Sequence, residues 1–326
     1  MDEKNEYYQL HGQGIGHRKT NRPILRFAGT GLFYHNGVQG TDFERIIDAA
    51  QDFIDTFPGT VTKFADAGRG DYALIKGNNW RDRSGYRPAT PVAADGFDLW
   101  VFSDENQPVI SFSTYLPVNE GPYRVQSPGL VYNAVPLVWI AEDPDRCVAK
   151  MARWCALLRP EQGTFGIGTV SSLGTSQRNY GMEYWPWLAR YSGLDAVTWM
   201  KYDRRNPHQA LRAVNWLTIL DDVWIDKLGG LERIAGSLHP EGSVYPYDGG
   251  AIIRACTHPQ MGDVNMTGVP EAYVMVDRLI RPFRYTDYAS GAPMDRLKVP
   301  EPLDPVETTV NWVRRFERFD PDAGGR

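Results

Sequence analysis

The spacing of apolar residues predicts an amphipathic helix in the first fifth of the chain. From Phe43 to Phe57 apolar side chains recur every three or four residues, which places them along one face of a helix. Thr41 and Glu44 have the spacing of a capping box, in which each side chain bonds a free backbone donor at the helix N-terminus. A Pro-Gly pair follows the last apolar position and ends the helix.

The remaining pattern mixes strands and helices without a fixed alternation. Runs of β-branched and aromatic residues predict strands at 24–34, 96–102, 109–116, 129–141, 164–171, 213–220, 243–247 and 251–256. Helical spacing or capping residues predict helices at 144–159, 179–190, 222–228, 231–238 and 270–280, and an amphipathic patch at 310–319. The stretch 60–91 shows no regular pattern. Because the repeated βαβ order of a parallel sheet is absent, we predict an α+β fold with largely antiparallel sheets and amphipathic helices packed on one face.

The same pattern suggests how the chain is organised. Residues 1–22 are polar and predict a flexible N-terminal arm. Residues 23–285 carry the regular elements and predict a single compact domain, with 23–140 and 141–285 as candidate βα-rich halves. Residues 286–326 are rich in Pro and Asp and predict a C-terminal tail.

Composition and charge narrow the class of protein. The 326 residues are 42% hydrophobic, which is enough for a substantial core, and carry a formal net charge of −5. This charge argues against a protein that coats nucleic acid, since that task needs clustered Lys and Arg. A small acidic surplus is compatible with a basic partner.

The cysteines and the apolar runs indicate a cytoplasmic protein. Cys147, Cys155 and Cys256 are odd in number, and none lies in a C-x-x-C pair, so we expect reduced, buried thiols. The N-terminus has no apolar segment of the kind found in a secretory signal. No apolar run approaches the roughly 18 residues that a membrane helix needs.

The residues that carry chemistry do not assemble into a known catalytic motif. The glycine-rich stretches lack nucleotide-binding spacing, and no G-x-S-x-G is present. His258 lies near Cys256, but the surrounding Pro and Gly residues indicate a surface turn rather than a metal site. Asp221, Asp222 and Asp226 are better explained as helix-capping residues than as a catalytic cluster. We therefore predict no catalytic residue, no metal and no cofactor.

Aromatic residues outside the expected core faces point instead to protein binding. The segment 76–88 contains Trp80, Arg81, Arg83 and Tyr86 within a polar, turn-rich sequence. Tyr, Trp and Arg are the residue types that most often anchor protein–protein contacts. The alternative is that these aromatic side chains pack beneath long loops of their own domain.

A series of short motifs in the last third of the chain resembles a known family. Their order and spacing resemble the bacterial type VI secretion immunity family, and the match is best over residues 190–285. Over 95–190 only the order of strands and helices agrees. The motifs are Ser192-Gly193-Leu194-Asp195, Val214-Asn215-Trp216-Leu217-Thr218, Leu228-Gly229-Gly230, Asp248-Gly249-Gly250, Pro259-x-x-Gly262-Asp263-Val264-Asn265, Pro270-x-x-Tyr273 and Leu279-x-x-Pro282.

The resemblance implies a cytoplasmic immunity protein that binds and blocks a cognate type VI effector. In this family the toxins are often nucleases of the restriction-endonuclease type, so the implied partner cleaves DNA. The motifs themselves fit turns, caps and core packing rather than toxin contacts. For the toxin-binding anchors we therefore choose Trp80, Arg81, Arg83 and Tyr86, in a complex that inhibits by stoichiometric binding.

Two other functions remain open from the sequence. A DNA-binding regulator of its own toxin–immunity operon would need a one-sided stripe of Lys and Arg and salt-sensitive DNA binding. An enzyme acting on the toxin or its product would need a pocket with a perturbed acid, base or metal site. The sequence determines neither the mode of inhibition nor the oligomeric state.

Overall fold

A single sheet connects the described parts of the chain. The computed structural model describes residues 10, 13–35, 42–66, 72–83, 99–104, 106–115, 129–172, 177–196, 210–289 and 296–317. Within these residues eleven strands form one sheet in the order β10-β11-β9-β8-β2-β7-β6-β5-β3-β4, with β1 paired to β2. Their bounds are β1 Gly14–Gly16, β2 Pro23–His35, β3 Val61–Asp66, β4 Tyr72–Leu74, β5 Leu99–Ser103, β6 Ser111–Tyr115, β7 Gly129–Val135, β8 Gln162–Ser171, β9 Leu217–Asp221, β10 Ser243–Tyr247 and β11 Gly250–Arg254. Every pair of neighbouring strands is antiparallel, so the predicted α+β class is confirmed.

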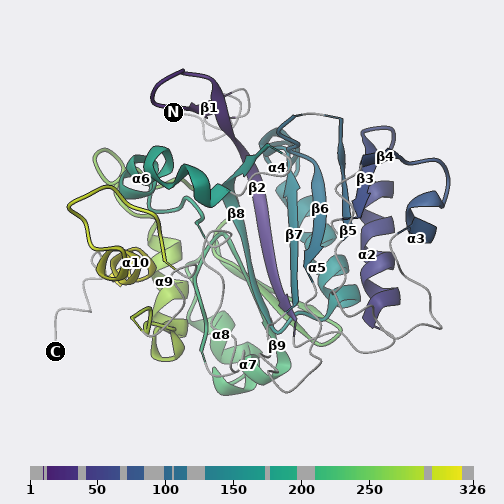
Figure 1. Cartoon of the computed structure of the whole chain (residues 1–326). Coiled ribbons are helices and arrows are strands. Elements are labelled where there is room, and N and C mark those ends of the chain that lie inside the picture. The colour runs from purple at the N-terminus through teal and green to yellow at the C-terminus, as the bar shows by residue number, and fades with distance from the viewer. Residues whose placement is uncertain are drawn as a thin grey trace, which may run out of the picture.

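Helices surround the sheet (Figure 1). Their bounds are α2 Asp42–Thr56, α3 Asn79–Arg83, α4 Leu137–Glu142, α5 Pro144–Leu158, α6 Gly181–Arg190, α7 Asp222–Lys227, α8 Leu231–Gly236, α9 Glu271–Ile280 and α10 Pro305–Val313, with 3₁₀ turns at Gln177–Tyr180 and Arg281–Phe283. The helices α2 and α5 pack on each other and on one face of the sheet. There the Phe53 ring lies 5.3 Å from Trp154 of α5 and 5.8 Å from Phe112 of β6.

The long strand β2 lies at the centre of the sheet. It pairs with β7 on one side and β8 on the other, so the two predicted βα-rich halves share one sheet. A Cβ atom at Gly29 would collide with Ile140 of α4, and one at Gly31 would collide with the Asn133 side chain of β7. Small residues are therefore needed in β2 where α4 and the neighbouring side chains approach it closely.

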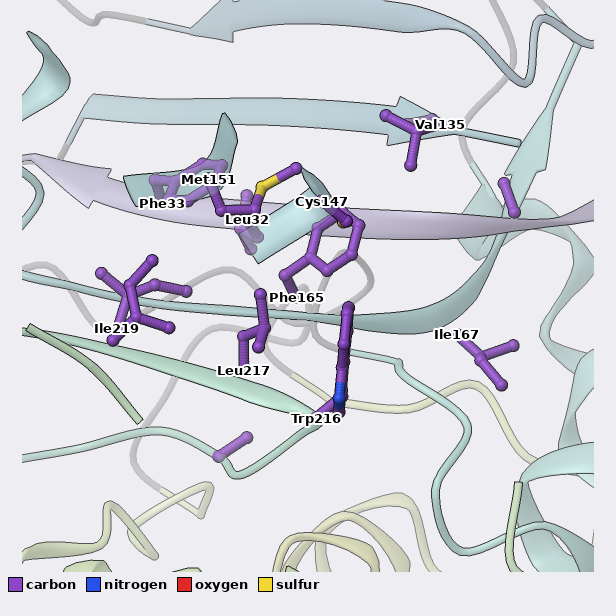
Figure 2. Packing of buried hydrophobic residues seen from close by; sticks show 14 of the residues in the cluster. Leu32, Phe33, Val135, Cys147, Met151, Phe165, Ile167, Trp216, Leu217 and Ile219 are labelled. Atoms are coloured by element: carbon purple, nitrogen blue, oxygen red, sulfur yellow. The ribbon is translucent and has the colours of Figure 1, made fainter. Parts of the chain in front are cut away.

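The hydrophobic core contains residues from β2 and from the elements around it. Figure 2 shows Phe33 of β2 and Phe165 of β8 close to Met151 of α5, with Trp216 beneath Phe165. The Phe165 and Trp216 ring centroids are 6.0 Å apart, and the indole of Trp216 donates to the Cys256 carbonyl oxygen over 2.7 Å. All three cysteines are buried and none forms a disulfide, as predicted.

Most elements with strong periodicity lie where the sequence predicts them. The helix over 43–57 is α2, the hairpin over 243–256 is β10–β11, and the strands at 96–102 and 109–116 pair as β5–β6. At α5 the Asp143 side chain accepts a hydrogen bond from the Arg146 backbone N–H over 2.9 Å, which confirms the predicted cap. The predicted capping box at α2 includes Thr41, which lies outside the described residues.

Several predictions from short apolar runs are wrong. The run 129–141 is not one strand, because β7 ends at Val135 and α4 begins at Leu137, with Pro136 at the helix N-cap. Proline suits a helix start, since the first helical N–H groups have no partner within the helix. The strand predicted at 213–220 begins only at Leu217. The sequence pattern also gave no sign of β3, β4 and α3, which lie in the stretch without regular spacing.

The described residues at both ends of the chain pack on the body. β1 pairs with β2, and α10 begins where Asp304 caps the backbone N–H groups of Val306 and Glu307. Beyond α10 the Arg315 side chain is buried and donates to the backbone carbonyl oxygens of Ser192 and Val214. None of the helices in the described residues combines the length and apolar character that crossing a membrane requires.

Candidate functional site

The predicted toxin-binding segment begins in a short helix at one end of the sheet. α3 follows β4, the last strand in the sheet order, and lies beside α2 (Figure 1). Trp80 is 1% exposed and belongs to the hydrophobic core. Its side chain therefore fixes α3 to the body. Arg83 closes the helix, and Tyr86 lies outside the described residues.

Of the two predicted anchors whose side chains the structure describes, Trp80 and Arg81, only Arg81 faces solvent. Its guanidinium lies over the Trp80 ring, 5.3 Å from the centroid, and its side chain remains 36% exposed. One guanidinium nitrogen donates to Gln51 Oε1 of α2 over 3.3 Å and lies 4.0 Å from the Asp48 carboxylate. These contacts orient the cation while leaving it accessible, and a preoriented side chain loses less entropy on binding.

The turn between β4 and α3 is held by Asn79. The Asn79 side chain accepts a hydrogen bond from the Lys76 backbone N–H over 2.8 Å and donates to the Leu74 carbonyl oxygen over 2.9 Å. Gly77 has φ +58°, a value that glycine adopts without strain. β4, the turn and α3 thus form one ordered unit, which we call the β4–α3 unit (residues 72–83).

Two exposed apolar side chains in this unit were missed by the sequence analysis. Tyr72 is 49% exposed and Leu74 is 53% exposed. They alternate with the half-buried Ala73, so both point to the same side of β4. The sequence does contain large apolar residues on both sides of Ala73, but a pattern of three residues is too short to predict a strand.

The groups considered for catalysis have structural roles in the described residues. The Asp221 carboxylate accepts a hydrogen bond from the Trp224 backbone N–H over 3.0 Å and caps α7, as predicted. The Cys256 thiol donates to the His258 carbonyl oxygen. Burial raises the pKa of the Cys147 and Cys155 thiols far above their usual range, which opposes formation of a nucleophilic thiolate. No three His, Cys, Asp or Glu side chains among these residues come together to hold a metal ion.

One buried carboxyl group is anomalous. Glu161 precedes β8 and is 6% exposed, and neither of its carboxyl oxygens has a hydrogen-bond partner among the described residues. Desolvation, followed by the nearby Asp221 charge, raises its pKa to about 8. The group is therefore mostly protonated at neutral pH.

Buried arginines lie near the other end of the sheet. Arg284 pairs with Asp277 and Glu317, and its guanidinium is 1% exposed. Arg315 is buried, with its guanidinium 3.9 Å from the Trp312 ring centroid. Desolvation lowers the pKa of Arg315 to about 9 and that of Arg284 to about 10. These groups connect the C-terminal segment to the body, and they lie too deep to meet a partner.

Comparison with known proteins identifies the family. A family model described as TsiV, type VI immunity for VRR-NUC, matches residues 45–316. The chain belongs to this family. The match confirms the resemblance to type VI immunity proteins and extends it across the β4–α3 unit. No curated protein matches this chain.

A solved structure supports the fold of this immunity-family member. It is the Pseudomonas aeruginosa T6SS protein PA0821, at a TM-score of 0.72 and 17% sequence identity. The similarity covers 97% of this chain and 90% of the other. At this identity the likeness concerns the fold.

Four glycines of the motifs that suggested the immunity family lie at turns with positive φ. Gly229 and Gly230 have φ values of +93° and +91° after α7, and Gly249 has φ +101° at the β10–β11 turn. Gly262 has φ +63° and packs against Pro270 and Ser192. These backbone requirements explain the glycines, and they confirm that the motifs serve the fold.

Proposed function

We propose that this chain binds a cognate VRR-NUC toxin and neutralises it as a stoichiometric protein inhibitor, without chemistry of its own. The observation that carries the proposal is the family match over residues 45–316. The structural roles of the Asp221 and Cys256 side chains are consistent with a binding protein. The toxin remains chemically unchanged in this proposal.

Titration of the toxin with the purified chain tests the proposal. Toxin activity on DNA should fall linearly and reach zero at a fixed molar ratio near one chain per toxin or a simple multiple. Toxin released from the complex by denaturation and refolding should have an unchanged mass and regain nuclease activity. Protection at strongly substoichiometric amounts, or a modified toxin, would contradict simple inhibition and favour an enzyme.

We assign the toxin contact to the β4–α3 unit and the residues after it. Arg81, Arg83 and Tyr86 would touch the toxin, while the buried Trp80 would hold α3 in place. Replacing the three contact residues by alanine should raise the dissociation constant about 10-fold to 100-fold with little change in folding, because interface anchors of these types dominate affinity. Surface plasmon resonance with an inactive toxin measures the effect.

A control separates the role of Trp80 from that of its neighbours. Trp80→Ala should lower the free energy of unfolding by about 3 kcal/mol or more, because it leaves a cavity in the core. The exposed basic residues Arg22 and Lys298 provide a control for lost positive charge, and their alanine variants should bind the toxin normally. Normal binding by the three-residue variant would remove this segment from the interface.

A cytoplasmic location is also part of the proposal. All three cysteines are buried and none forms a disulfide, which is usual for proteins of a reducing compartment. Fractionation of cells that express the chain from its own gene should recover it with cytoplasmic markers. Recovery with periplasmic markers would contradict this location.

A further inference from the structure

Strand β4 lies at an edge of the sheet that is open among the described residues. It pairs with β3 through Lys63↔Leu74 and Ala65↔Tyr72, and it has no second neighbour in the sheet order. Beyond the strand, the Ile75 backbone N–H donates to the Thr62 carbonyl oxygen over 2.8 Å. This hydrogen bond shows which residue pairs of the antiparallel β3–β4 pairing are hydrogen-bonded to each other.

The alternation of an antiparallel ladder then determines the direction of each backbone group. The pair Thr62↔Ile75 is hydrogen-bonded, so the pair two residues away, Phe64↔Ala73, is hydrogen-bonded as well. Tyr72 and Leu74 occupy the alternate pairs, and their N–H and C=O groups point away from β3. The Leu74 carbonyl oxygen accepts from Asn79. Within the part of the chain that the structure describes, both backbone groups of Tyr72 and the N–H of Leu74 are then left for a further strand.

The side chains of the same two residues supply apolar contact area. Tyr72 and Leu74 are each about half exposed, although a protein surface usually leaves few neighbouring large apolar residues uncovered. The Tyr72 ring stands edge-on to the buried Phe102 ring of β5, with the ring centroids 5.4 Å apart, so one part of it packs on the body. Sites that bind an extended peptide by strand addition combine open backbone groups at a sheet edge with contacts to alternate side chains of the peptide.

The opposite edge of the sheet lacks these features. β10 contains Pro246, which has no N–H to donate, and α8 packs against the strand. Proline and covering helices are common ways to prevent a further strand from adding. The edge at β10 is thus less suited to adding a strand than the edge at β4.

We propose that β4 binds an extended segment of the VRR-NUC toxin, which adds to the sheet beside Tyr72 and Leu74. The toxin segment would place apolar side chains against these two residues and pair its backbone with their outward N–H and C=O groups. This inference rests on the proposed function and names the part of the β4–α3 unit that makes the main contact.

Side-chain variants test the apolar contact. The double variant Tyr72→Ser, Leu74→Ser should raise the dissociation constant for inactive toxin about 30-fold or more, mainly through faster dissociation. The matched control, Met266→Ser with Leu303→Ser, removes two apolar side chains that are 79% and 42% exposed elsewhere on the surface. It should bind with the wild-type constant.

Backbone variants test the added strand. Leu74→Pro and Leu74→Ser both lose the apolar side chain, but only proline also removes the outward N–H. We expect proline to weaken binding about 5-fold further than serine, the effect of one lost hydrogen bond. Because this N–H does not bond β3, the proline variant should still fold. Hydrogen exchange of the wild-type complex provides a second readout that needs no variant, since the Tyr72 and Leu74 amides should become protected.

The outcomes separate this inference from the proposed function. Wild-type protein that fails to bind any VRR-NUC toxin would refute the proposed function. Wild-type binding together with unchanged binding by the serine double variant would refute only the β4 contact. Equal binding by the proline and serine variants, with no amide protection, would refute strand addition. A concentration-dependent dimer that the serine variant abolishes would make a second copy of this chain the occupant.

Discussion

Replacing Arg284 by methionine is expected to lower the free energy of unfolding by about 3–5 kcal/mol, the usual result of removing one partner from a buried ion pair. The Arg284 guanidinium bonds the carboxylates of Asp277 and Glu317, and the Asp277 side chain is 1% exposed. Without Arg284, the cationic partner that Asp277 keeps among the described residues is Arg281, at 3.1 Å. Unfolding in urea at pH 7 measures the loss.

A second substitution identifies the cause of that loss. Asp277→Asn in the Arg284→Met background removes the buried charge that lost its main partner, so the double variant should be more stable than the sum of the two single changes predicts. Additive effects would assign the loss to packing instead. If the free energy of unfolding of Arg284→Met lay within about 1 kcal/mol of the wild-type value, the loss would be smaller than the usual cost of an unpaired buried charge. Arg281 alone would then be enough to compensate the Asp277 charge. Either result would mean that the ion pairs of Arg284 with Asp277 and Glu317 contribute less to stability than their burial suggests.

Replacing Glu161 by glutamine is expected to stabilise the protein at alkaline pH. The pKa of Glu161 is about 8 in the folded protein, against an ordinary value of 4.5. Between these values the unfolded chain releases the proton while the folded protein keeps it, so the wild type loses stability as pH rises from about 4.5 to 8. Allowing for solvent screening near the surface, we expect Glu161→Gln to be about 2–3 kcal/mol more stable than wild type at pH 9.

The dependence on pH is the decisive part of this prediction. At pH 4 the two proteins should differ little, because Glu161 is protonated in both the folded and the unfolded state. Glu142→Gln, at an exposed position, should follow the wild-type profile throughout. A stability difference between Glu161→Gln and wild type that stays constant from pH 4 to pH 9 would show that the pKa of Glu161 is not raised in the folded protein.

Charge pairing between α2 and α5 shows how far apart the determinants of this fold lie in sequence. Asp52 accepts from the Trp154 indole over 2.9 Å and pairs with Lys150 and Arg153 of α5. The apolar periodicity predicts both helices, but it does not predict that one carboxylate joins them. The contact depends on the tertiary fold, which brings residues about one hundred positions apart together.

The sequence by itself determined the strongly periodic elements, the absence of a catalytic motif and, through the order of its turn motifs, the family. Helical spacing along α2 and α5 and the positive-φ glycines at Gly229 and Gly249 are local requirements, so they can be read without neighbours. Short elements do not carry enough residues for such a reading. The strand β4 and the helix α4 therefore could not be predicted from the sequence pattern and were found only in the three-dimensional structure.

The tertiary structure alone decided which side chains are available to a partner. Burial depends on what packs over a residue from distant parts of the chain, and local sequence does not contain that information. The tertiary structure places Trp80 in the core, leaves Tyr72 and Leu74 exposed on an edge strand, and buries Glu161 and Arg315. The sequence indicated the types of residue that suit an interface. Only the order of the strands showed which residues lie at the β4 edge of the sheet, which is open among the described residues.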